Sequence, residues 1–330
     1  MQVSPNRAFA LATDPARPPQ ALAGAVYAIG NFDGVHRGHA AVIARTTALA
    51  RRRAAPSAAL TFEPHPADYF AGRPVVFRLT PFAVKARALQ ALGLDGAVVL
   101  AFDASLAEMT AEEFVERVLV ERLAVGAVVV GWDFRFGKAR LGAPALLARA
   151  GARLGFDVDI VDRVESRDGG PPRAISSSGI RRALEQGDVA AAARDLGRAY
   201  AVVGAVVPGR RLGHTLGVPT ANVALEPTNR LAFGVYAARA RVAGRAYAGV
   251  ASFGVRPTVD GGGAPVLETH LFDFSGDLYG QEIEVAFVER LRDELKFASL
   301  EELKAAMARD MARARAALAA PPPGCSPQVP

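Results

Sequence analysis

Short apolar runs alternate with stretches of helical periodicity through the first half of the chain. The apolar runs are rich in strand-forming residues and lie at Val26–Ile29, Ala58–Phe62, Ala97–Phe102, Ala127–Val130 and Val158–Val161. The helical patterns between them include Ala40–Arg53, Pro81–Leu92 and Ala111–Leu123. Alternation of this kind favours βαβ units, because parallel neighbours need crossover connections. We therefore predict an α/β domain with a doubly wound, Rossmann-like parallel sheet.

The pattern changes after about residue 185. Six short β-branched or aromatic runs follow, separated by Gly, Pro and Asn turns, at Tyr200–Val207, Thr220–Leu225, Gly234–Val242, Tyr247–Ser252, Val266–Phe272 and Glu282–Val288. Strands at this spacing predict an antiparallel six-stranded β-barrel. A terminal helix follows, with a capping box from Ser299 and Glu302 and an apolar face of Leu300, Leu303, Met307 and Met311. The predicted domains are residues 1–185 and 186–320, with a disordered tail at 321–330.

Composition narrows the classes of partner. A chain of 330 residues has room for two domains, and its net charge of +6 is modest and suits small anionic ligands such as ATP. We expect no nucleic acid as a partner, because no basic stripe is interleaved with aromatic residues. The single cysteine, Cys325, excludes an intramolecular disulfide framework. With neither a signal peptide nor a membrane span in the sequence, we expect a cytoplasmic protein without membrane contact.

The most informative segment is the decapeptide from Gly30 to His39, which joins the first apolar run to the first helical pattern. Glycines let the backbone approach a ligand, and the free N–H groups of a helix start attract anions. His36 and His39 add donors that stabilise charge on a phosphate undergoing substitution. A plainer alternative is a tight turn with two surface histidines. The Gly-x-Phe-Asp before the histidines and the glycine between them favour the first interpretation, and the segment resembles the His-x-Gly-His signature of the nucleotidyltransferase superfamily.

Four further segments of the first half carry polar residues at strand ends and helix starts. They are Thr61–Pro66, Leu79–Pro81 with Lys85, Val130–Gly137 and Ile175–Arg181. Each alone also fits an ordinary helix cap or core packing. Their joint order and spacing resemble the FMN adenylyltransferase module of the prokaryotic bifunctional riboflavin kinase/FAD synthetases.

This resemblance implies transfer of AMP from ATP to FMN, with release of pyrophosphate. It places His36 and His39 on the ATP phosphates, supported by Ser177, Ser178 and Arg181. It also implies that Gly30, Phe32, Asp33 and Gly38 shape the nucleotide pocket. His65 and Asp133 are expected on the FMN side. Because FMN already carries an ionised phosphate, its oxygen needs no general base to attack, and catalysis depends on alignment and charge stabilisation.

The second dense motif runs from Gly209 to Asn222, where glycines and arginines precede a strand. Thr220 and Asn222 lie two apart and therefore share one face of a strand. Their oxygens are hard ligands of the kind that Mg²⁺ prefers when it arrives with ATP. The glycines fit a loop for a phosphate-bearing ligand, and they fit equally an ordinary β-turn before a strand, so both interpretations stay open. The Pro219–Asn222 tetrapeptide, Pro-Thr-Ala-Asn, resembles the riboflavin kinase family.

This second resemblance implies phosphorylation of riboflavin by ATP. Glu268, which stands before Thr269 and His270, would be the general base, because the attacking ribityl hydroxyl benefits from losing its proton. The family's ATP site would comprise Arg210, Gly213, Gly217, Pro219, Thr220 and Asn222, with Mg²⁺ on the last two. Arg292 and Phe297 would border riboflavin.

The resemblance covers about residues 20–311, with three departures. Ser178 stands where the family commonly has Thr, Gly142-Ala143 replaces a common Gly-Asp, and Ser252 replaces a common Asn. We expect altered affinity, not lost activity. Two other functions stay open: a related nucleotidyltransferase with a flavin-binding appendage, and a non-catalytic flavin sensor. We predict a bifunctional enzyme that binds riboflavin, FMN and ATP as a monomer or weak homo-oligomer, with flavins as substrates and products.

Overall fold

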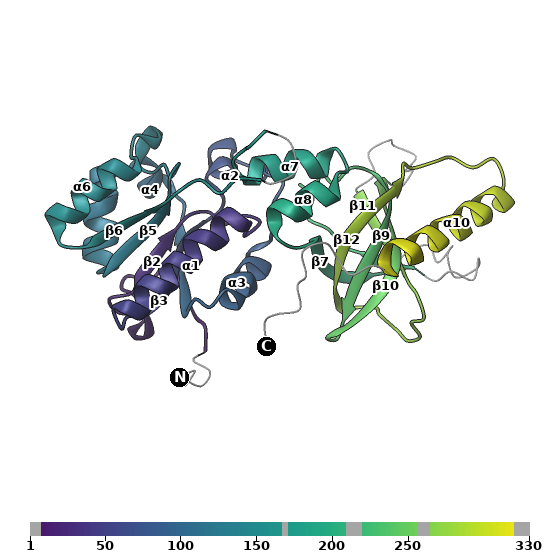
Figure 1. Cartoon of the computed structure of the whole chain (residues 1–330), viewed down its shortest axis with the longest axis horizontal. Helices are drawn as coiled ribbons and strands as arrows, with labels where there is room; N and C mark the ends of the chain where they lie inside the picture. The colour runs from purple at the N-terminus through teal and green to yellow at the C-terminus, as the bar shows by residue number, and fades with distance from the viewer. Residues whose placement is uncertain (1–7, 167–170, 209–219, 256–264, 320–330) are drawn as a thin grey trace. The chain divides into compact units, whose positions relative to one another are not determined.

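The computed structural model describes residues 8–166, 171–208, 220–255 and 265–319 (Figure 1). The chain divides into two compact units. The first unit extends to Ile175, and the second begins at Ser176. Residues 77–79 are an exception, because they belong to the second unit. The predicted limits of the two domains at residue 185 stay a prediction. The predicted tail at 321–330 lies outside the described residues.

A six-stranded parallel sheet forms the centre of the first unit. The strands are β1 (Ala10–Thr13), β2 (Val26–Ile29), β3 (Ser57–Glu63), β4 (Gly96–Ala101), β5 (Ala127–Gly131) and β6 (Asp157–Val161). Their spatial order is β1-β4-β3-β2-β5-β6, and each neighbouring pair is parallel. The loops after β3, β2 and β5 therefore leave the same edge of the sheet side by side, where open parallel sheets bind their ligands.

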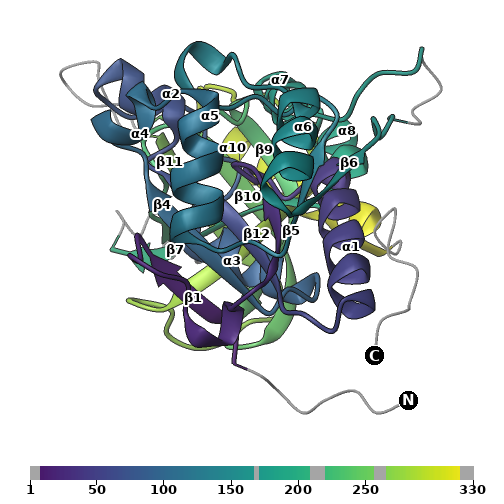
Figure 2. The same ribbon diagram turned by 90° about the vertical axis from the view of Figure 1, so that its left-hand side faces the viewer.

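Helices cover both faces of this sheet (Figure 2). On one face, α1 (Arg37–Arg52) and α3 (Phe82–Ala91) pack their apolar side chains over the central strands. On the other face, the π-helix η2 (Phe114–Arg122) and α6 (Pro144–Leu154) close a second core. The central strands are buried on both sides, which explains their continuous apolar sequence. The predicted doubly wound sheet is confirmed.

The structure adds elements that the pattern did not predict. The edge strand β1 has the sequence Ala-Leu-Ala-Thr, in which alanine, a residue depleted in strands, takes two of the four positions. The helix predicted at Ala111–Leu123 is one turn of α-helix, α5 (Ala111–Glu113), continued by η2. Short helices also lie in connections, namely η1 (Gln20–Leu22), α2 (Pro66–Ala71), α4 (Ala104–Glu108) and η3 (Lys138–Arg140).

A closed antiparallel barrel forms the centre of the second unit, as predicted. Its strands are β7 (Tyr200–Val207), β8 (Ala221–Val223), β9 (Gly234–Val242), β10 (Arg245–Val255), β11 (Pro265–Leu271) and β12 (Glu282–Arg292). They close in the order β10-β11-β8-β7-β12-β9. Alternate residues fill the interior, and α7 (Ser177–Glu185) and α8 (Val189–Leu196) contribute to the same core.

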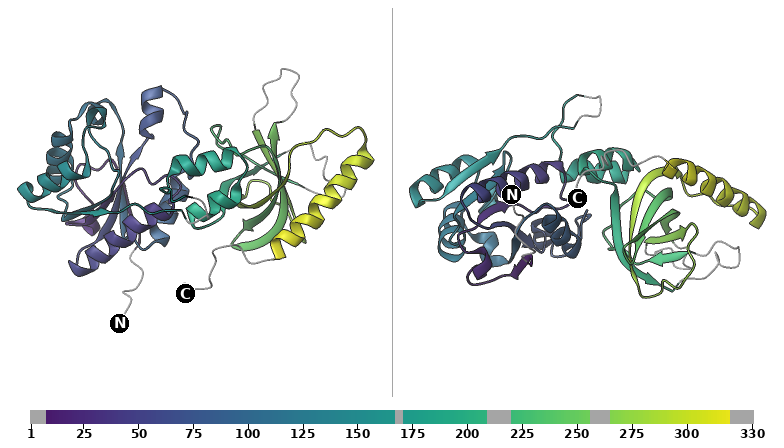
Figure 3. Two further views of the ribbon diagram at one scale, coloured as in Figure 1. Left: turned by 45° about the horizontal axis from the view of Figure 1, so that its top comes forward. Right: turned by 60° about the horizontal axis from the view of Figure 1, so that its bottom comes forward.

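The last helix, α10 (Leu300–Ala319), lies along the outside of the barrel, against β9, β10 and β12 (Figure 3). Its first turn is capped by Ser299, whose Oγ accepts from Glu302 N at 3.2 Å. The predicted apolar face is wrong in part, because Leu300 is 50% exposed. The fully buried positions are Ala306, Asp310, Ala314 and Leu318. Small side chains at these positions let the helix approach the strands closely. The prediction selected the larger apolar residues, which lie on an adjacent face of the helix.

Candidate active sites

The loop between β2 and α1 places His36 and His39 together. His36 is the N-cap of α1, and its Nδ1 accepts from His39 N at 3.3 Å. The two imidazoles are stacked, with ring centroids 3.6 Å apart and planes 15° apart. Because Nδ1 accepts a hydrogen bond, the proton of neutral His36 lies on Nε2, which is then the nitrogen able to donate to a ligand.

The glycine between the histidines is needed for this packing. A Cβ at Gly38 would lie 3.0 Å from His36 Cε1 and 3.1 Å from His36 Nδ1. These distances are shorter than ordinary van der Waals contact, so an alanine would displace the imidazole. Gly38 therefore acts through the position of His36.

The same loop is held in a left-handed conformation that non-glycine residues rarely adopt. Phe32 has φ of 50° and Val35 has φ of 41°. Asp33, 2% exposed, accepts from Thr80 N at 3.0 Å, while Gly34 N donates to Thr80 Oγ1 at 3.0 Å. Asp33 thus fixes the loop to the segment before α3. The buried Phe32 ring meets His39 edge-on, with centroids 5.2 Å apart.

The two residues predicted on the FMN side belong to neighbouring loops. His65 is the N-cap of α2, and its Nδ1 accepts from Ala67 N at 3.2 Å. Asp133 is exposed and comes two residues after the end of β5. Since β2 lies between β3 and β5, the structure brings the loops of His36, His65 and Asp133 to one sheet edge.

The predicted phosphate-binding residues Ser177, Ser178 and Arg181 lie in the first turns of α7. Ser176 is the N-cap, and its side chain accepts from Gly179 N at 3.2 Å. Ser178 is exposed and Ser177 half-buried, while Arg181 Nε donates to the carbonyl of Phe77 at 2.7 Å. The sequence signal for a helix start is confirmed here. The grouping of these residues with the two histidines stays a prediction.

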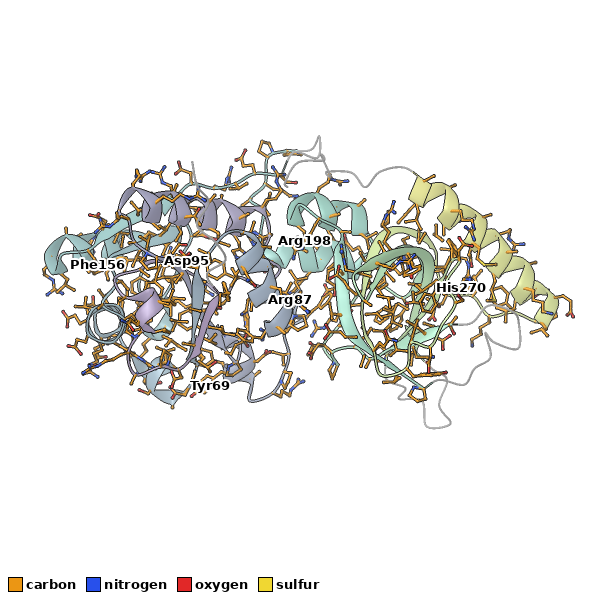
Figure 4. All side chains as sticks on the ribbon, turned by 90° about the horizontal axis from the view of Figure 1, so that it is seen from below. Tyr69, Arg87, Asp95, Phe156, Arg198 and His270 are labelled. Atoms are coloured by element: carbon orange, nitrogen blue, oxygen red, sulfur yellow. The ribbon has the colours of Figure 1, made fainter. Side chains whose placement is uncertain are left out.

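Three polar residues lie side by side on the barrel. Glu268 of β11 is opposite Asn222 of β8 on one side and Ser252 of β10 on the other. Their flanking residues, such as Leu267 and Ala221, point into the barrel core. Side chains alternate along a strand, so the three polar side chains share the face turned away from that core, where Ser252 and Glu268 are half-buried and Asn222 is 5% exposed. His270, two residues beyond Glu268, is on the same strand (Figure 4).

The remaining residues of this predicted site divide between described and undescribed segments. Thr220 is half-buried and immediately precedes β8, two residues before Asn222. Four residues predicted in the ATP site lie outside the described residues: Arg210, Gly213, Gly217 and Pro219.

Arg292 and Phe297, the two residues predicted to border riboflavin, lie close together. The guanidinium carbon lies 5.6 Å from the centroid of the Phe297 ring. Arg292 also donates to both carboxylate oxygens of Asp310, at 2.8–3.1 Å. Sequence reasoning missed Asp310, although a carboxylate between Ala306 and Ala314 at four-residue spacing is a signal for a charge facing inward.

Glu294 is a second missed residue near Arg292. Although Glu294 is exposed as a whole, partial burial of its carboxyl raises the pKa, and the nearby Arg292 partly opposes that rise. The carboxylate fills the space beside Gly254, where a Cβ would lie 1.7 Å from Glu294 Oε1. Only glycine fits at residue 254 while the carboxylate keeps this position.

No helix of the described part is long and apolar enough to cross a membrane. Among the described residues, no group of three or more His, Cys, Asp or Glu side chains is placed to hold a metal ion.

Comparison with known proteins assigns a family to each half. Residues 19–178 match the family model of FAD synthetase, and residues 196–318 match that of riboflavin kinase. Fold and sites therefore define a two-part flavin-nucleotide transferase, with a nucleotidyltransferase sheet followed by a flavokinase barrel.

Full-length relatives carry both halves. The bifunctional riboflavin kinase/FMN adenylyltransferase of Pseudomonas fluorescens is 44% identical over 298 residues, which are 90% of this chain and 94% of the relative. The Escherichia coli K12 protein of the same name is 42% identical over 293 residues, which are 88% of this chain and 92% of the relative. A Streptococcus pneumoniae crystal structure, described as a macrolide-efflux protein, matches with a TM-score of 0.80 and 30% identity, covering 92% of this chain and 98% of the other.

The chain belongs to the bifunctional riboflavin kinase/FMN adenylyltransferase family. It has riboflavin kinase and FMN adenylyltransferase activities, and the predicted family and fold class are confirmed.

Proposed function

We propose that adenylyl transfer takes place at the sheet edge beside His36 and His39. A phosphate oxygen of FMN attacks the α-phosphorus of ATP, a new P–O bond forms, and the bond to pyrophosphate breaks. No proton has to be removed, because the attacking phosphate is ionised at neutral pH. His36 Nε2–H and the His39 imidazole stabilise the charge that develops on the phosphates.

The other residues of this site bind and align the substrates. Ser177, Ser178 and Arg181 bind the ATP phosphates, because the first turn of a helix presents free N–H groups and the positive end of its dipole. The nucleotide pocket is shaped by Gly30, Phe32, Asp33 and Gly38. His65 and Asp133 lie on the FMN side. The adjacency of the loops after β3, β2 and β5 supports this arrangement.

Riboflavin phosphorylation takes place on the outer face of the barrel. Glu268 accepts the proton of the ribityl 5′-hydroxyl as its oxygen attacks the γ-phosphorus of ATP, and ADP leaves. Arg292 and Phe297 border the riboflavin, while the segment with Arg210, Gly213, Gly217 and Pro219 receives ATP. The register that sets Glu268 opposite Asn222 supports this assignment.

Mg²⁺ fits the oxygen atoms available on this face. The hydroxyl of Thr220, the amide oxygen of Asn222 and the adjacent Glu268 carboxylate are hard donors of the kind Mg²⁺ binds, and few protein ligands suffice because the ion keeps waters and phosphate oxygens. Thr220 and Asn222 would hold the ion. Bound with ATP, Mg²⁺ neutralises charge on the transferred phosphoryl group.

The remaining assignments complete the proposal. The two domains are residues 1–185 and 186–320, and the protein acts in the cytoplasm on riboflavin, FMN and ATP. It works as a monomer or weak homo-oligomer, with neither nucleic acid nor a membrane as partner.

The observation that carries the two-site proposal is that the stacked histidines and the Asn222–Glu268 pair belong to different compact units. Glu268→Gln should abolish FMN formation from riboflavin and leave FAD formation from supplied FMN unchanged. His39→Ala should do the reverse and let FMN accumulate. Chromatography of flavins after incubation with ATP and Mg²⁺ measures both reactions. Loss of the same step in both variants would contradict the assignment, and flavin binding without turnover in the wild type would indicate a sensor.

A further inference from the structure

Lys85 of α3 is a buried cation beside the adenylyltransferase site. Its side chain is 1% exposed, and α3 is the helix that carries the labelled Arg87 in Figure 4. Its Nζ lies 2.8 Å from Glu63 Oε1, 3.2 Å from the carbonyl oxygen of Asn31 and 3.3 Å from Thr61 Oγ1. An ammonium group has three N–H donors, which is enough for one hydrogen bond to each of these oxygens.

The three oxygens all belong to the edge of the sheet where the candidate site lies. Glu63 ends β3 and Thr61 lies two residues before it, while Asn31 follows β2 in the loop that leads to the histidines. Thr61 Oγ1 also donates to the Asn31 carbonyl at 3.3 Å. The Asn31 carbonyl is thus held by both Lys85 and Thr61.

The contact with Asn31 immediately precedes the strained part of the loop. Phe32, the next residue, has φ of 50° and packs its ring against His39. A non-glycine residue in this conformation costs about 1 kcal/mol or more, and it persists only where neighbouring contacts enforce it. The segment around α3 holds this loop at two points. Thr80 bonds to Asp33 and Gly34, and Lys85, five residues after Thr80, bonds to Asn31.

We propose that Lys85 is a positioning residue for adenylyl transfer. Its ammonium holds the Asn31 carbonyl, which sets the backbone of Phe32 and through its ring the position of His39. Glu63 is the counter-ion that makes a buried ammonium tolerable. Being buried, Lys85 acts through the loop and does not contact the nucleotide.

The test uses Lys85→Met in the full chain, assayed for FAD formation from FMN and ATP at a temperature where the domain stays folded. A misplaced catalytic group costs about tenfold to a hundredfold in rate, so we expect a fall of that size in kcat with little change in the KM for FMN. Riboflavin phosphorylation by the same chain should be unchanged. An unchanged kcat in folded Lys85→Met would overturn the proposal.

A double variant separates positioning from stability. Lys85→Met leaves the Glu63 carboxylate without its counter-ion, so Lys85→Met/Glu63→Gln should recover much of the unfolding free energy while kcat stays low. Recovery of kcat together with stability would show a purely structural ion pair and refute positioning. Arg153→Met is the matched control, because it removes an exposed ion pair with Glu116 in the same unit, 2.7 Å long. It should change neither quantity.

A milder substitution keeps the test decisive if Lys85→Met does not fold. Thr61→Val is nearly isosteric and removes the hydroxyl that contacts both Lys85 and Asn31. We expect a several-fold lower kcat for FAD formation and a smaller loss of stability than in Lys85→Met, because the ammonium loses one acceptor but keeps its counter-ion. A wild-type kcat in folded Thr61→Val would contradict the role of the Asn31 carbonyl.

Discussion

Asp310 of α10 and Arg292 of β12 form a two-point ion pair that joins the last helix to the barrel. Three donor–acceptor distances between them are 3.1 Å or shorter, and their side chains are only 7% and 20% exposed. Arg292 also lies over Phe297. The planar guanidinium suits such a geometry, because its parallel N–H groups match two carboxylate oxygens. The helix thereby fixes the orientation of an arginine that we assign to the riboflavin site.

Asp310→Asn should weaken both the barrel and the riboflavin site. Loss of one partner of a buried ion pair costs about 3–5 kcal/mol, which urea unfolding would measure. In the folded protein the KM for riboflavin should rise, while FAD formation from FMN stays unchanged. Asp273→Asn is the control, since it alters an exposed contact with Arg315 at 3.4 Å. A normal riboflavin KM in Asp310→Asn would exclude a role for this pair in substrate binding.

Local patterns along the sequence predicted most of the strands, because alternation and β-branched runs mark them directly. The six barrel strands and five of the six sheet strands, β2 to β6, were predicted near their observed positions. The Asn222–Glu268 register was not predictable, since strand pairing joins residues far apart in the chain. For a related reason the sequence did not single out Asp310, and it gave no role to Lys85 although Lys85 belongs to one of the four motif segments of the first half. Each is a charged residue on a helix, and only the tertiary structure shows that it is buried against a side chain of opposite charge.

Gly38→Ala should reduce FAD formation without a matching loss of stability. Alanine favours a helix over glycine by about 1 kcal/mol, but its Cβ would press on the His36 imidazole. We expect these effects to offset each other in unfolding, while the displaced histidine lowers kcat for pyrophosphate release. Ala44→Gly, at an exposed position of the same helix, tests propensity alone and should lower stability with normal kcat. Full activity of Gly38→Ala would mean that the His36 ring position is unimportant.

Two buried tyrosines should make the protein sensitive to alkali. Burial raises the pKa of Tyr27 in the first unit and of Tyr236 in the second to about 12. Below pH 10 the two tyrosines are protonated in the folded and in the unfolded protein. Above pH 10 they lose their protons in the unfolded chain first, because their pKa is higher in the folded state. Stability should therefore fall between about pH 10 and 12. A shift of two pKa units corresponds to about 2–3 kcal/mol for each tyrosine.

Phenylalanine substitutions distinguish the two tyrosines. Among the residues that the structure describes, the buried Tyr27 hydroxyl has no hydrogen-bond partner. Tyr27→Phe should therefore keep or raise stability at pH 8, by up to about 1 kcal/mol, and reduce the alkaline loss. Trp132, the single tryptophan, lies in the first unit, and its fluorescence during urea unfolding reports on that unit. Tyr236→Phe loses a hydrogen bond to the Ala232 carbonyl and should leave the Trp132 transition unchanged. An alkaline loss that persists in full in Tyr27→Phe would assign the sensitivity to other groups.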